Sequence, residues 1–256
     1  MEQSQPHPET THTEAPYTDA PSAHVFIVTY GRSGSTLLQN LLNRFDGYCI
    51  RGENNATLSH LVRAWDAVER GESMRGARWR GVLMEPGNPW YGAELVDPDA
   101  YGRALAATFT REVLHPPAGT RVAGFKEIRH TSQSQVNLFP RQMEFMRRFF
   151  PDARFVFNTR DHDAVMRSGW WTKWTRTDPD AVRALLTRAD ALFSESAAAH
   201  PDCSLQLRYE DYDANPDGLR PLFEFLGEPF DQEMAGAVLA RRLDHLKAKK
   251  ERGVQC

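Results

Sequence analysis

The chain has 256 residues, of which 41% are hydrophobic, so it can bury the core of one α/β domain. Its formal net charge is −3, and residues 1–22 hold four acidic side chains but no Lys or Arg, which leaves the remainder at +1. This balance excludes a general nucleic-acid binder, because such a protein carries a strong basic excess.

Three scattered cysteines, Cys49, Cys203 and Cys256, form neither a metal-ligand pattern nor a disulfide framework. No apolar run approaches the ~20 residues that a membrane span needs, and no hydrophobic signal segment opens the chain. We therefore expect a cytoplasmic protein without a metal site. Residues 1–22 are rich in Pro, Thr, Glu and His and predict a disordered leader, followed by one domain over 23–256.

The first predicted element is a strand, a tight loop and a helix. An apolar run over 24–30 is followed by the loop residues Gly31, Arg32, Ser33, Gly34, Ser35 and Thr36, and leucines then recur at helical spacing from residue 37. The helix start presents free backbone N–H groups, the glycines let the backbone approach a ligand closely, and the hydroxyls add donors. This unit predicts an anion-binding loop.

The loop lacks the features of the common nucleotide-binding loops. A nucleoside-triphosphate loop has a lysine immediately before its hydroxyl residue, whereas here Gly34 precedes Ser35. The dinucleotide pattern G-x-G-x-x-G is also absent. Arg32 is the only cation of the loop, which indicates a ligand less charged than a triphosphate. The alternative is an ordinary strand-to-helix turn with incidental glycines.

A short strand is predicted over 48–51, and Gly52 and Glu53 follow it. Ligands gather at the carboxyl ends of parallel strands, where a carboxylate can accept a proton from a hydroxyl. Alternatively, Glu53 caps the next helix or pairs with Arg51.

A helix is predicted over 57–69. The glycine-rich and proline-containing segment 70–96 is predicted to be an irregular insertion that helps to cover an acceptor, or else a solvated loop.

Further strands are predicted over 121–128, 153–159 and 204–209, and helices separate them. This alternation predicts an α/β fold with a parallel sheet and helices on both faces. Lys126 and His130 lie at the end of the first of these strands. Arg160 follows the second, and Ser168 comes eight positions later, just over two helical turns. Arginine donors match phosphate oxygens, although an ion pair with Asp163 is the alternative role for Arg160.

In this order the motifs resemble those of the sulfotransferases that use 3′-phosphoadenosine 5′-phosphosulfate (PAPS). The resemblance rests on the loop at 31–36, on Arg160 with Asp163 and Ser168, and on a Tyr-Glu-Asp strand end at 209–211 with an Asn-Pro turn and a Phe-Leu-Gly helix end after it. The pattern is closer to the bacterial, carbohydrate and tyrosylprotein types than to the cytosolic small-molecule branch, whose late Arg-Lys-Gly-x-x-Gly-Asp-Trp stretch is missing. It implies a single-domain P-loop NTPase-like sulfotransferase fold.

The resemblance also implies how the donor is held. The loop residues Gly31–Thr36 would bind the 5′-phosphosulfate of PAPS, and Arg160, Ser168 and Tyr209 would bind its 3′-phosphoadenosine end. PAPS would be a co-substrate, and no metal is implied.

For the chemistry, the resemblance implies Glu53 as the base and Arg32 with Lys126 as stabilisers of the leaving group. His130 is the alternative base, because cytosolic members place a histidine after their lysine, at a shorter spacing than here. The expected acceptor is a hydroxyl, less readily an amine, of a small molecule or carbohydrate. A P-loop-type small-molecule kinase and a non-catalytic nucleotide-binding relative are the alternatives, and the sequence leaves the acceptor's identity and the oligomeric state open.

Overall fold

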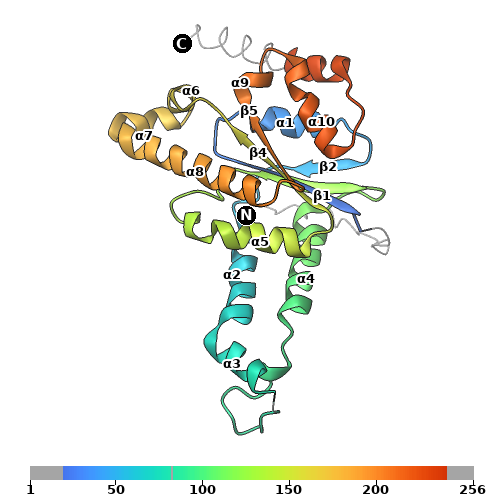
Figure 1. The fold of residues 1–256 in the computed structure, drawn as a ribbon, viewed down its shortest axis with the longest axis vertical. Helices are drawn as coiled ribbons and strands as arrows, with labels where there is room; N and C mark the ends of the chain where they lie inside the picture. The colour runs from blue at the N-terminus through green and yellow to red at the C-terminus, as the bar shows by residue number, and fades with distance from the viewer. Residues whose placement is uncertain (1–19, 82, 241–256) are drawn as a thin grey trace, which may run out of the picture.

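A computed structural model describes residues 20–81 and 83–240 (Figure 1). Within them, five parallel strands form one sheet in the order β2-β3-β1-β4-β5. The strands are β1 (Ala23–Thr29), β2 (Tyr48–Arg51), β3 (Val122–Glu127), β4 (Ala153–Thr159) and β5 (Ser204–Arg208). The predicted fold class and strand positions are therefore confirmed. The predicted leader over 1–22 falls mainly outside the described residues.

Helices cover both faces of the sheet. In β1, Phe26 and Val28 pack into the core on one face, whereas Val25 and Ile27 pack into the core on the other. Side chains alternate along a strand, so a strand that is buried on both faces reads as one continuous apolar run. The first core is completed mainly by α2 (Thr57–Arg70), α5 (Phe139–Phe149) and α8 (Pro179–Ala199), and the second by α1 (Ser35–Leu42) and α10 (Arg220–Leu226).

Shorter elements connect these layers. They are α6 (His162–Met166), α7 (Trp171–Thr177), α9 (Tyr209–Tyr212), the 3₁₀ turns at Ala93–Leu95, Val136–Leu138 and Pro216–Leu219, and a π-helical turn at Phe109–Leu114 that continues α4 (Pro98–Thr108). No helix in the described ranges combines the length and apolar character needed to cross a bilayer.

The central position of β1 determines where the site can form. β1 pairs with β3 on one side and with β4 on the other, with Val28 opposite Glu127 and Thr29 opposite Asn158. The loops that follow these three strands therefore emerge side by side at one edge of the sheet.

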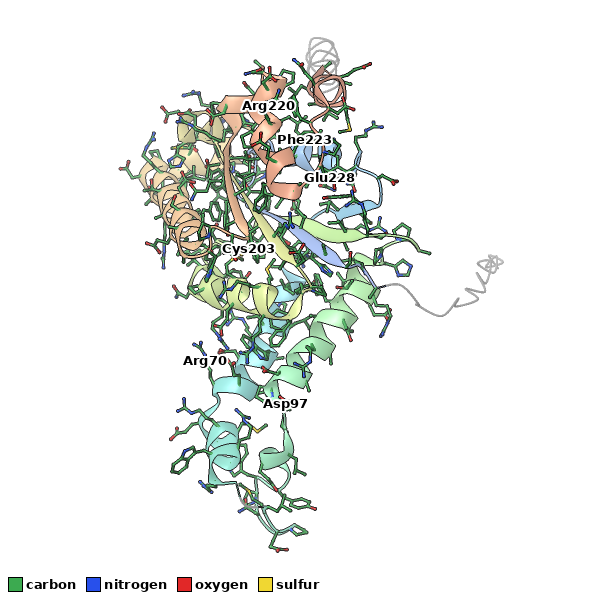
Figure 2. The ribbon with its side chains drawn as sticks, turned by 45° about the vertical axis from the view of Figure 1, so that its right-hand side comes forward. Arg70, Asp97, Cys203, Arg220, Phe223 and Glu228 are labelled. Carbon is green, nitrogen blue, oxygen red and sulfur yellow. The ribbon has the colours of Figure 1, made fainter. Side chains whose placement is uncertain are left out.

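α2 and α4 extend away from the sheet as an arm, with α3 (Glu72–Arg80) at its far end (Figure 1). Figure 2 shows Arg70 and Asp97 on this arm, with the sheet between them and Phe223 of α10. The prediction that 70–96 is irregular is wrong over α3, where Gly81, at φ +63°, ends a helix. The described residues of segment 70–96 also line neither of the two cavities at the sheet edge, so they do not cover them.

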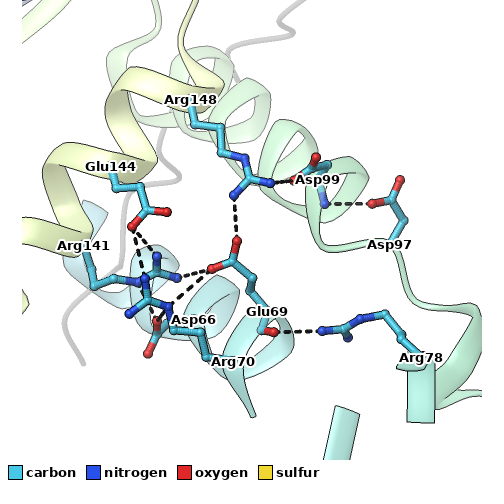
Figure 3. Close-up of polar contacts among 9 residues, drawn as sticks. All are labelled: Asp66, Glu69, Arg70, Arg78, Asp97, Asp99, Arg141, Glu144 and Arg148. Carbon is cyan, nitrogen blue, oxygen red and sulfur yellow. Dashed lines mark hydrogen bonds and ion pairs between the residues drawn. The ribbon is translucent and has the colours of Figure 1, made fainter. Parts of the chain in front are cut away.

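A network of ion pairs fastens the arm to the body (Figure 3). Arg141 of α5 is buried, and its guanidinium donates to Asp66 at 2.6 Å and to Glu69 at 2.5 Å, both on α2. Arg148, also on α5, contacts Glu69 and reaches Asp99 on α4. Both helices of the arm are therefore anchored to α5.

Candidate active site

A cleft of about 830 Å³ opens at the carboxyl ends of the strands. Its wall contains most of the predicted anion-binding loop together with residues that follow β2, β3 and β4. Among the residues that the structure describes, four cationic side chains line it, Arg32, Arg44, Lys126 and Arg160, against a single carboxylate, Glu53. This excess of positive charge favours an anionic ligand.

The loop between β1 and α1 has the backbone geometry of an anion cradle. Gly34 adopts φ +87° as the residue before α1, and no side chain caps that helix. A Cβ added to Gly34 would lie 2.2 Å from the ring of Tyr209, so only glycine fits there. Arg32 also has a positive φ, +70°, which is strained for a residue with a side chain. The backbone N–H groups at the start of α1 are thus left for a ligand.

Ser33 does not line the cleft, unlike the other five loop residues. It is fully buried, its hydroxyl accepts a hydrogen bond from Thr29 at 2.7 Å, and its carbonyl accepts one from the Asn158 amide at 2.9 Å. The side chain predicted to bind the donor instead holds the shape of the loop. Asn158 was not identified from the sequence as a residue that holds this loop. A polar amide at the end of an otherwise apolar strand is the feature that could have identified it.

Arg160 and Arg32 lie in direct contact. Arg160 Nη1 donates to the carbonyl oxygen of Arg32 at 2.9 Å, and Arg32 Nε donates to Ser168 Oγ at 3.0 Å. The alternative ion pair of Arg160 with Asp163 is not formed, because Asp163 pairs with Arg183 at 2.5 Å. Within residues 20–240 as described, Arg160 has no carboxylate partner, and its buried Nε has no acceptor.

Ser168 and Tyr209 support this pair of arginines rather than line the cleft. The Tyr209 ring is 1% exposed, and the Arg160 guanidinium lies 4.4 Å from its centre. A cation over an aromatic face is held in place electrostatically. Both residues predicted to bind the donor thus contact an arginine of the cleft and are not themselves among its lining residues.

Glu53 and Lys126 meet at the opposite wall. Lys126 Nζ donates to Glu53 Oε1 at 2.5 Å, and both residues line the cleft. The alternative roles for Glu53 are not observed: the residue before α2 is Ala56, without a side-chain cap, and Arg51 donates instead to the carbonyl oxygens of Leu114 and His115.

Glu127, which sequence reasoning missed, positions this pair. Its fully buried carboxylate accepts backbone N–H groups from both neighbouring loops: Asn54 and Ala56 after β2, and Ile128 and Arg129 after β3, at 2.9–3.2 Å. One carboxylate therefore joins the loop carrying Glu53 to the end of the strand carrying Lys126. An acid inside a strand that is otherwise buried is the signal that could have identified it.

His130 is not brought to the cleft. Its ring is buried, Nδ1 contacts the Gln142 amide oxygen of α5, and burial lowers the pKa of this histidine. His130 is not among the residues that line the cleft, whereas Glu53 is. The structure therefore does not support the alternative base.

Comparisons with known proteins agree with this geometry. The model of the sulfotransferase family matches residues 24–232. Among solved structures, the sulfotransferase domain of the Synechococcus PCC 7002 olefin synthase aligns with a TM-score of 0.51 and 20% identity over 86% of this chain and 78% of that one. The sulfotransferase domain from the curacin biosynthetic pathway aligns with a TM-score of 0.51 and 18% identity, over 84% and 77% of the two chains. These likenesses establish the fold. Curated proteins provide no match.

Proposed function

This chain belongs to the sulfotransferase family, and on that premise we propose that it transfers the sulfuryl group of PAPS to a hydroxyl, less readily an amine, of a small-molecule or carbohydrate acceptor. The observation that carries the proposal is that Arg32 and Arg160 share one cleft with Glu53 and Lys126. This cleft thus combines a site for a doubly phosphorylated nucleotide with a proton acceptor.

The donor is assigned to the cationic wall. The backbone N–H groups at the start of α1, with the hydroxyls of Ser35 and Thr36, hold the 5′-phosphosulfate. Arg160 binds the 3′-phosphate, because its guanidinium is fixed over Tyr209 and its Nε has no acceptor among the described residues. The four cations of the cleft fit the charge of this donor.

The chemistry requires positioning and charge stabilisation. The acceptor oxygen forms a bond to sulfur while the bond from sulfur to the bridging phosphate oxygen breaks. The acceptor proton passes to the Glu53 carboxylate. The negative charge that develops on the departing 3′-phosphoadenosine 5′-phosphate (PAP) is stabilised by Arg32 and by Lys126, which must turn from Glu53 toward that oxygen.

The two alternatives receive less support. A kinase would need the missing lysine before Ser35. A non-catalytic relative would leave Glu53 and Lys126 turned away from the cleft, whereas both line it.

The test is PAPS-dependent sulfation of an acceptor panel, followed by mass spectrometry, with PAP binding measured by calorimetry. We expect PAP to bind and at least one acceptor to gain a sulfuryl group, with no requirement for magnesium. Failure of PAP to bind, or magnesium-dependent turnover of ATP, would overturn the proposal.

A further inference from the structure

A second, larger cavity of about 1660 Å³ opens directly off the cleft. Gly31, Glu53, Ile128 and Trp170 line both cavities. The other walls of this groove come mainly from α7, the first half of α8 and residues 128–129 and 131–137. Because Glu53 lies where the two cavities meet, an acceptor hydroxyl placed beside it leaves the rest of the acceptor in the groove.

One wall of the groove is aromatic. Trp170 and Trp174 line it and are 46% and 54% exposed, and their rings form an edge contact at 5.6 Å. Trp171 is buried behind them, stacks on Trp170 at 4.2 Å and donates from Nε1 to the Gly31 carbonyl. The exposed indoles of Trp170 and Trp174 thus pack on Trp171, which is hydrogen-bonded to the loop at 31–36. Aliphatic side chains of α8, including Leu185, face the same space. Apolar surface of this kind is covered favourably by an apolar ligand.

Three cations also line the groove: Arg129, Lys173 and Arg188. Arg129 and Arg188 donate to the neutral amides of Asn55 and Asn137, at 2.8 and 3.1 Å. None of the three forms an ion pair with any residue that the structure describes.

The acidic side chains of the groove are already engaged. Glu53 is paired with Lys126, and Asp178 accepts the Ala181 N–H as the cap of α8. The Asp178 carboxylate keeps its charge in that bond, so three cations of the groove face one carboxylate that has no cationic partner among the described residues, and the groove stays net positive. This positive charge is separate from the cations of the donor cleft, which line the other cavity.

Building on the proposed function, we infer that the acceptor is an amphipathic alcohol: an extended apolar chain or ring system that carries an anionic group at a distance from the hydroxyl. The apolar body lies against Trp170 and Trp174, and the anion is bound by Lys173 and Arg188. The volume supports an extended ligand, because small-molecule sites commonly occupy ~300–1,000 Å³. This narrows the acceptor class and disfavours an unmodified neutral sugar.

The test compares matched acceptor pairs: a long-chain ω-hydroxy fatty acid with its methyl ester, and a hydroxyphenylalkanoic acid with its methyl ester. In the wild type we expect kcat/KM with PAPS to favour the acid of at least one pair by about tenfold, since a charge-assisted contact is worth that much. Lys173→Gln combined with Arg188→Gln should bring the ratio close to one. Arg176→Gln, which removes an exposed charge of α7 outside the groove, is the matched control and should preserve the ratio.

Acceptor binding without turnover provides a second readout, because the exposed indoles report on the groove by fluorescence. The acid should bind more tightly than its ester, and added salt should weaken that preference. Equal affinities in both pairs, faster sulfation of esters or neutral sugars, or an unchanged ratio in the double variant would overturn the inference. PAP binding by calorimetry separates the two proposals: if PAP binds and neutral acceptors are sulfated equally well, only the acceptor class is wrong.

Discussion

Arg160 donates a hydrogen bond of 2.9 Å to the carbonyl oxygen of Arg32, although 128 positions separate them in the chain. Arg32 in turn donates to Ser168. The two segments proposed to bind opposite ends of one nucleotide therefore form a continuous wall of a single cleft. Substitutions in either segment should therefore change the affinity for the same nucleotide.

Arg160→Gln should weaken PAP binding by about tenfold to a hundredfold, because it removes charge-assisted bonds to a phosphate. Calorimetry with PAP measures the change, and turnover at saturating donor should fall much less. Arg220→Gln is the control, since Arg220, at the start of α10, forms an exposed pair with Asp217 of the preceding 3₁₀ turn. Wild-type PAP affinity in Arg160→Gln would contradict the assignment.

Glu53→Gln should bind PAP with nearly wild-type affinity and lose turnover by about 10²–10⁴-fold, because the amide cannot accept the acceptor's proton. Single-turnover sulfation measured beside PAP binding separates the two effects. If the variant sulfates at the normal rate, proton transfer goes to water or to another group.

Glu127→Gln should lower turnover while leaving PAP affinity intact, because the amide keeps one acceptor oxygen and its NH₂ cannot accept the two N–H groups that the other carboxylate oxygen now binds. Hydrogen exchange at residues 54–56 or 128–129 should accelerate at the same time. Slower turnover without faster exchange there would show that Glu127 does not act by positioning the Glu53 loop.

Arg141→Gln should lower the free energy of unfolding by about 2–3 kcal/mol, because removing the buried guanidinium leaves three partly buried carboxylates without their cationic partner. Denaturant unfolding measures this loss. The exposed Arg183 in its pair with Asp163 provides the comparison, for which a much smaller loss is expected because solvent screens an exposed ion pair. PAP binding of the folded Arg141 variant should be unchanged, because neither Arg141 nor the carboxylates that it binds line the cleft.

Burial lowers the pKa of His24 from 6.5 to about 4, partly offset by its hydrogen bond to the Pro151 carbonyl. Between these values the unfolded chain binds the proton more strongly, so stability is complete above about pH 6.5 and is lost as the pH falls toward 4. From pH 7 to pH 5 this histidine should account for a loss of about 2 kcal/mol. His24→Gln should show a smaller loss in denaturant unfolding over this range, and an equal loss would contradict the assignment.

Local sequence was sufficient for the elements and for much of the site. Continuous apolar runs, helical leucine spacing and glycine turns are patterns of a few neighbouring residues. They therefore predict all five strands and the loop at 31–36 without any knowledge of tertiary contacts. The assignments that failed depend on long-range packing. Ser33 is turned inward beside Asn158 of β4, which binds the Ser33 carbonyl from 125 positions away. His130 is turned toward Gln142 because α5 packs against it.

By itself, the sequence determined a parallel α/β fold and its polar residues at strand ends, because each of these follows from short-range pattern and charge. Only the tertiary structure decided which of those strand ends come together in the wall of the cleft. Pairing of β1 with both β3 and β4 brings Lys126 and Arg160 to opposite sides of one loop, and Glu127 then fixes Glu53 beside Lys126. Such proximity arises from hydrogen bonding between strands about a hundred residues apart, which no local pattern encodes.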